Sequence, residues 1–222
     1  MRKSSTSRSQ RSHHQRLQRK HVVWGALLAS MTMVGGVLLL LEDRPAAEAM
    51  PMAQVARASR SSGIEAVLQP VSSRESSPWK GIVIHHSATP FGSAHTISDQ
   101  HIARGFKGLG YHFVIGNGQG APDGQIVVGY RWQDQLPGVH TSGPQAETYN
   151  RETIGICLVG DGDRREFTTA QFERLMELVT TLQAGLGIPD HAVVLHRDVA
   201  PTSAPGRHFP EISLRQRLLS AQ

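Results

Sequence analysis

GIVIHHS, at residues 81–87, is a short apolar run that ends in two histidines. Its length and its isoleucine and valine content predict a buried β-strand. Because side chains alternate along a strand, His85 and His86 must point to opposite faces of the sheet. Four more strand-like runs follow, at 111–116 (YHFVIG), 125–129 (QIVVG), 153–159 (TIGICLV) and 192–196 (AVVLH).

Two helical patterns lie between these runs. Thr168 and Gln171 have the spacing of a capping box, and the apolar residues after them fall on one helical face until Gly185 and Gly187 end the pattern. A weaker pattern covers residues 98–106. Strands mixed with helices predict an α/β fold, a single domain with a central mixed β-sheet flanked by helices, over residues 79–222.

The N-terminal region differs from the rest in charge and hydropathy. Residues 1–21 carry seven basic side chains and no acidic one, and the rest of the chain carries sixteen basic and eighteen acidic ones. The high pI therefore belongs to the tail, and we expect no nucleic-acid-binding face. Residues 22–41 are uncharged over 20 residues, the length with which a helix crosses a hydrocarbon core of about 30 Å.

The charge asymmetry around residues 22–41 predicts an orientation in the membrane. By the positive-inside rule, residues 1–21 form a basic cytoplasmic tail, 22–41 a single anchor in the inner membrane, 42–78 a flexible linker and 79–222 a periplasmic domain. The alternative is a signal peptide cleaved near Ala47-Glu-Ala49, which would release a secreted protein. The one cysteine, Cys157, excludes an internal disulfide, and we expect a monomer.

A second histidine closes another strand-like run. His196 ends the run at 192–196 and opens the turn LHRDVAPTSAPG, residues 195–206. Histidines held at the ends of two distant strands can share one zinc ion. A catalytic zinc usually has three protein ligands and one open position, and the natural place for the third ligand is the turn after His196.

Six segments in order resemble the zinc-dependent N-acetylmuramoyl-L-alanine amidases of the phage-lysozyme and peptidoglycan recognition protein type. They are IVIHHSAT (82–89), GLGYHFVI (108–115), GQIVVG (124–129), GVHTSG (138–143), ETIGICLVGD (152–161) and LHRDVAPTSAPGRHFP (195–210). The resemblance runs from about residue 80 to residue 210 and implies a fold like that of the peptidoglycan recognition proteins.

The resemblance also implies a metal site and its ligands. It places zinc on His85, on His196 and on a cysteine or aspartate eight residues later, where this chain has Ala204. An alanine cannot bind a metal, so His208 or Asp198 is a candidate substitute ligand.

Further positions take catalytic and binding roles from the same resemblance. Tyr111 matches a catalytic tyrosine that orients the zinc-bound water or stabilises the oxyanion, and Thr202 matches a position that can hydrogen-bond the developing oxyanion. His140 and Asn150 match groove-lining positions, where contact with substrate and support of the loop are both open. Cys157 lies among apolar residues, which raises the pKa of a thiol and argues against a nucleophile.

The function implied is that of a peptidoglycan hydrolase. Such an enzyme cleaves the amide between N-acetylmuramic acid and L-alanine with a zinc-activated water. Because Ala204 stands in the ligand position, the alternative is a catalytically impaired module that binds peptidoglycan.

Overall fold

The computed structural model describes residues 64, 66–68 and 77–220. Five strands form one sheet, in the order β3-β2-β4-β1-β5. They are β1 (Gly81–His86), β2 (Phe113–Ile115), β3 (Ile126–Val128), β4 (Thr153–Leu158) and β5 (Val193–Leu195). β2 and β3 pair antiparallel and the other pairs are parallel. This is the mixed central sheet that the sequence predicts.

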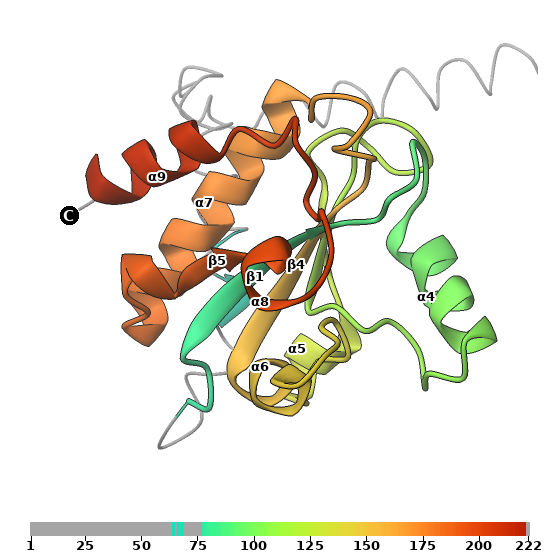
Figure 1. Cartoon of the computed structure of the whole chain (residues 1–222), viewed down its shortest axis with the longest axis horizontal. Coiled ribbons are helices and arrows are strands. Elements are labelled where there is room, and N and C mark those ends of the chain that lie inside the picture. Colours follow the sequence, from blue (N-terminus) through green and yellow to red (C-terminus); the bar gives the residue numbers. More distant parts are fainter. Residues whose placement is uncertain (1–63, 65, 69–76, 221–222) are drawn as a thin grey trace, which may run out of the picture. The chain divides into compact units, whose positions relative to one another are not determined.

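The alternation of side chains divides the sheet into two different faces. Ile82, Ile84, Ile154 and Ile156 belong to the main hydrophobic core, which α7 (Thr169–Leu186) and α9 (Glu211–Ser220) cover from one side. The opposite face carries a smaller apolar cluster that includes Cys157 of β4 and packs against α4 (Ala94–Ala103). Figure 1 shows α4 on the side of the sheet away from α7 and α9.

Local capping sets the helix boundaries. The Thr168 hydroxyl accepts from the backbone N–H of Gln171 at 3.0 Å, and the Gln171 side chain accepts from the N–H of Thr168 at 3.3 Å, which confirms the capping box at the start of α7. Gly187, at φ +68°, ends that helix in the left-handed conformation. α4 begins at Ala94, earlier than expected, because Ser93 caps it through Thr96.

Short helices connect the strands. They are α5 (Tyr130–Gln133), α6 (Ala146–Glu152) and α8 (His196–Val199), and 3₁₀ turns occur at Ala66–Leu68 and Asp190–Ala192. The sequence predicts none of these. The strand expected at 192–196 ends at Leu195, because His196 is the first residue of α8.

Part of the segment assigned to the linker lies in the core. Ile64 and Val67 are about 5% and 6% exposed and belong to the main core cluster. The indole N–H of Trp132 donates to the carbonyl of Val67 at 2.7 Å. The packed body therefore includes residues before Trp79, where the sequence places its start.

The described residues contain no helix that is both long and apolar enough to cross a membrane. The anchor expected at 22–41 and the tail at 1–21 lie outside the described residues.

Candidate functional site

The structure brings His85 and His196 together. β1 and β5 are parallel neighbours, and each has one of the two histidines at or just after its carboxyl end. The imidazole centroids lie 4.2 Å apart. His86 follows on the other face of β1, where its Nδ1 accepts from the N–H of Gly162 at 3.0 Å, so His86 has a structural role.

Each of the two histidines presents a buried nitrogen without a partner. His85 Nδ1 and His196 Nε2 make no hydrogen bond within the described part of the chain. A buried polar atom left unsatisfied costs about 1–3 kcal/mol, and a bound metal ion would satisfy both atoms at once. Burial lowers the pKa of His85 well below its usual value and that of His196 to about 4. Both rings are therefore neutral at pH 7, the form that binds zinc.

The third ligand position has no donor. Ala204 is buried, its carbonyl accepts from the N–H of Arg197 at 2.8 Å, and its N–H donates to the hydroxyl of Thr202 at 3.2 Å. The described residues include no group of three or more histidine, cysteine, aspartate or glutamate side chains that could hold a metal. The described residues therefore offer two of the three protein ligands that a catalytic zinc usually has.

Neither substitute ligand joins the two histidines. His208 is exposed on the surface. The Asp198 carboxylate accepts from the N–H of Leu195 at 2.9 Å and lies 3.7 Å from Arg215, so it caps α8 and pairs with α9. The suggestion that His208 completes the site is not supported by its position.

Tyr111 lies beside the histidine pair. Its ring centroid is 5.1 Å from that of His85, and it packs against the small apolar cluster that includes Cys157. Burial, with a further effect of Cys157, raises the pKa of Tyr111, and burial likewise raises the pKa of the Cys157 thiol. At neutral pH the Tyr111 hydroxyl therefore keeps its proton and can donate a hydrogen bond, and Cys157 is a thiol. Thr202 is exposed, in the turn that leads to Ala204.

The side chains of His140 and Asn150 form hydrogen bonds with other residues of the protein. The ring nitrogens of His140 lie 3.1 Å from His85 Nε2 and 3.2 Å from the carbonyl of Thr153. The Asn150 side chain accepts from the N–H groups of His140 and Thr141 at 2.8 and 3.0 Å, and donates to the Thr141 carbonyl at 3.2 Å. Of the two roles that the sequence leaves open, this geometry corresponds to support of the loop. The ring of His140 is buried and both its nitrogens are engaged, which differs from a groove-lining role.

Sequence reasoning missed a further buried histidine behind the site. His112 is completely buried; its Nδ1 accepts from the N–H of Gly155 at 2.9 Å, and its Nε2 pairs with the carbonyl of Leu136 at 3.1 Å. Burial lowers the pKa of His112 to about 4. No signal in the sequence separates this histidine from an exposed one, because both of its partners are backbone groups.

His112 makes the stability of the fold depend on pH. The unfolded chain binds a proton near pH 6.5 and the folded chain does not, so stability is present above pH 6.5 and is lost as the pH falls toward 4. For the full chain without metal, we expect His112 alone to lower the free energy of unfolding by about 1.4 kcal/mol between about pH 7.5 and 5.5. Urea titrations of the wild type and of His112→Leu at both pH values measure the loss, because the difference between the two chains isolates the contribution of His112. An NMR titration of His112 with a midpoint near its ordinary pKa would contradict the prediction.

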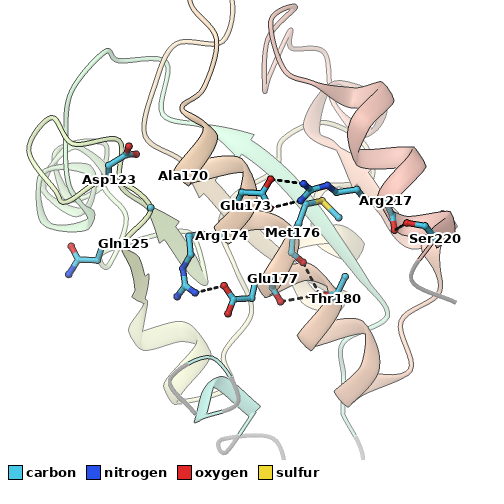
Figure 2. Close-up of a pocket in the computed structure, with 11 residues that line it drawn as sticks. Asp123, Gln125, Ala170, Glu173, Arg174, Met176, Glu177, Thr180, Arg217 and Ser220 are labelled. Atoms are coloured by element: carbon cyan, nitrogen blue, oxygen red, sulfur yellow. Dashed lines mark hydrogen bonds and ion pairs between the residues drawn. The ribbon is translucent and has the colours of Figure 1, made fainter. Parts of the chain in front are cut away.

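A wide, open pocket lies away from this site. It has a volume of about 1020 Å³ and lies between α7, α9 and the turn before β3. Figure 2 shows four of its charged side chains in two ion pairs: Arg217 donates to Glu173 at 2.5 and 2.7 Å, and Arg174 pairs with Glu177. None of the site residues expected from the sequence lines this pocket.

Comparison with known proteins gives one consistent family. The family model described as N-acetylmuramoyl-L-alanine amidase matches residues 75–208. The endolysin of Enterobacteria phage T3 is 33% identical over 134 residues, which is 57% of this chain and 80% of the endolysin.

Two solved structures are also similar. The endolysin N-acetylmuramoyl-L-alanine amidase LysCS from Clostridium intestinale URNW is 28% identical with a TM-score of 0.55, over 65% of this chain and 87% of that one. Peptidoglycan recognition protein-LE, solved in complex with tracheal cytotoxin, a monomeric diaminopimelic acid-type peptidoglycan, is 26% identical with a TM-score of 0.51, over 61% and 79%. With its mixed sheet, its paired histidines and these relatives, the chain belongs to the N-acetylmuramoyl-L-alanine amidase family of the phage endolysins and peptidoglycan recognition proteins.

Proposed function

We propose that this chain is a peptidoglycan hydrolase that cleaves the amide between N-acetylmuramic acid and L-alanine and holds one zinc ion on His85 and His196. The observation that carries the proposal is the pair of neutral imidazoles, each with a buried nitrogen that has no hydrogen-bond partner among the described residues. When bound, zinc polarises a carbonyl and lowers the pKa of a coordinated water from about 15.7 toward about 7.

The chain's own residues supply the rest of the site. Tyr111, whose raised pKa keeps the hydroxyl protonated, can donate a hydrogen bond to the oxygen on which negative charge develops. Thr202 offers a second hydroxyl in the turn after His196. Because Ala204 supplies no anionic ligand, we expect zinc to be held several kcal/mol more weakly than in a site with three ligands, given about 10–16 kcal/mol for structural zinc sites.

Metal content and cell-wall cleavage, measured together on the purified full chain, test this proposal. We expect one zinc ion per chain when zinc is supplied, and release of free L-alanine amino groups from sacculi. His85→Ala should abolish both. A chain that binds no zinc and releases no amino groups is not the proposed hydrolase.

Tyr111→Phe separates catalysis from metal binding. Removing one donor to an oxyanion typically costs about 100-fold or more in kcat. We expect the variant to lose about 100-fold in kcat and to keep its zinc content, because Tyr111 is not a ligand. Equal losses of zinc and of activity would show that Tyr111 acts by supporting the histidines.

Ala204 supports a second candidate, a module that binds peptidoglycan without cleaving it. A domain of this kind would be retained on sacculi and release no amino groups. Its retention would survive His85→Ala, since this function does not require the metal. Sedimentation of the full chain with sacculi, beside the cleavage assay, separates the two functions.

The predicted topology places either activity next to the cell wall. We propose that residues 22–41 anchor the chain in the inner membrane and that the domain is a monomer in the periplasm. A reporter that works only in the periplasm should be active when fused after Gln222. A fusion active only in the cytoplasm, or a mature chain that begins near Met50, would contradict the anchor.

A further inference from the structure

A chain of hydrogen bonds leads from the backbone of β4 to the unpartnered nitrogen of His85. His140 Nε2 lies 3.2 Å from the carbonyl oxygen of Thr153, and a carbonyl can only accept, so this nitrogen carries the proton. A neutral imidazole has one N–H, so Nδ1 of His140 is an acceptor. It lies 3.1 Å from Nε2 of His85, which must therefore donate. The lone pair of His85 is then on Nδ1, the buried atom without a partner.

The position of His140 is built into the fold. A Cβ atom at Gly138 would lie 2.2 Å from Cδ2 of His140, and one at Gly155 would lie 2.5 Å from the same atom. These two glycines leave a slot for the imidazole, in accord with the use of glycine in a strand where another group approaches closely. Asn150 fixes the backbone of His140 by accepting its N–H at 2.8 Å. Ring and backbone are thus both held.

We infer that His140 is a positioning residue that fixes His85 as the Nε2–H tautomer, so that His85 offers Nδ1 as its metal-binding atom beside His196. Metal-binding histidines commonly donate their second ring N–H to an outer partner, which sets tautomer and ring orientation, and loss of that partner costs about 10–100-fold in metal affinity. Here the outer partner is a third histidine, whose own tautomer is set by a backbone carbonyl. Only the affinity part of the inference rests on the proposed function.

The tautomer can be measured without any metal. In the full chain, kept in detergent because of its apolar residues 22–41 and labelled with ¹⁵N-histidine, long-range ¹H–¹⁵N spectra distinguish Nδ1–H from Nε2–H. The His85 signals are identified by their loss in His85→Gln. We expect the Nε2–H pattern for His85 in the metal-free protein, and a mixture of tautomers in His140→Leu. A wild-type His85 in the Nδ1–H form would overturn the inference.

Zinc affinity provides the second readout, by competition with a chromophoric chelator. We expect His140→Leu to bind zinc about 10–100-fold more weakly. His140→Asn should retain most of the affinity, because its side-chain oxygen can accept from His85 near the place of Nδ1.

His112→Leu is the matched control. His112 is likewise buried, but its two ring nitrogens are hydrogen-bonded to the backbone of Gly155 and Leu136 and not to His85 or His196. This variant should lose stability and keep both the tautomer of His85 and the zinc affinity. If His112→Leu weakens zinc as much as His140→Leu, or if His140→Leu changes neither property, the inference is wrong.

The two proposals fail in different ways. A wild-type chain that binds no zinc would remove the proposed metal-dependent function, and the tautomer measurement would still decide the role of His140. If His140→Leu does not fold, the tautomer of His85 in the wild type and the zinc affinity of His140→Asn test the inference instead.

Discussion

Ala204→Cys should raise the zinc affinity of the full chain at least tenfold, about 1.4 kcal/mol, and increase its cleavage of peptidoglycan. A thiolate is an anionic ligand that binds zinc strongly, and it would add a third donor to His85 and His196. The substitution adds one sulfur atom at a residue whose backbone is already fixed: Ala204 accepts from Arg197 at 2.8 Å and donates to Thr202 at 3.2 Å. Tyr111 is already beside the histidines.

Two comparisons isolate the thiolate as the cause. The serine in Ala204→Ser has nearly the same size as the cysteine in Ala204→Cys, but its hydroxyl is a poor zinc ligand. The zinc affinity of Ala204→Ser should therefore remain close to that of the wild type. His85→Ala in the cysteine background should abolish the gain, because one histidine and one thiolate do not make the site. Competition titrations with a chelator and amino-group release from sacculi measure the two effects.

The outcome of this substitution separates the two candidate functions. A gain in zinc and in cleavage together would show that one missing ligand limits the site. If the cysteine variant neither binds zinc nor cleaves peptidoglycan, the site differs from an active one at more than one position. The chain is then better described as a module that binds peptidoglycan. A wild type that already binds zinc tightly and cleaves well would mean that the site does not need a protein ligand at position 204.

The sheet could be predicted because most of its strands are apolar on both faces. β1 and β4 are buried at every position, so their sequences read as unbroken apolar runs. α7 carries its own start and stop signals at Thr168 and Gly187. α9 has no such mark: within its ten residues only Leu214 and Leu218 are buried, too few for a clear helical period.

Part of the candidate site can likewise be predicted from the sequence, and part cannot. His85 and His196 could be placed together, because each closes a strand-like run and adjacent parallel strands end at the same edge of a sheet. The part played by His140 depends on the carbonyl of Thr153 and on the slot beside Gly155. A backbone carbonyl leaves no trace in a sequence, and a lone glycine in a strand indicates close approach without naming the group that approaches.

The burial of Ile64 and Val67 in the core cannot be predicted from the sequence for a related reason. Ile64 and Val67 are isolated apolar residues in a stretch rich in alanine, serine and arginine, with no sustained period. Their burial depends on residues far away in the sequence. The indole N–H of Trp132 donates to the carbonyl of Val67, and the side chain of Leu68 packs so close to Gly185 that a Cβ atom there would clash with it. Contacts of this kind appear only once the chain is folded.

Removing residues 1–78 should lower the free energy of unfolding by about 5 kcal/mol, relative to a chain that begins at Ala56. Burying a side chain such as Ile64 or Val67 stabilises by about 1.5–3 kcal/mol, and the indole N–H of Trp132 loses its acceptor, at a cost of about 1–3 kcal/mol. Whole domains are stable by about 5–15 kcal/mol, so the shorter chain is expected to be marginal.

Urea unfolding of the two truncated chains, followed by tryptophan fluorescence, measures this difference. Ile64→Ala with Val67→Ala in the longer chain should reproduce more than half of the loss but not all of it, because the carbonyl of residue 67 still accepts from Trp132. Leu219→Ala is the control, since Leu219 is 70% exposed and such changes stay within about 0.5 kcal/mol. Equal midpoints for the two chains would show that the segment before Trp79 contributes nothing. If the loss is as large as expected, an inactive fragment that begins at residue 79 reports a weakened fold, and only the longer chain can test whether His85 and His196 bind zinc.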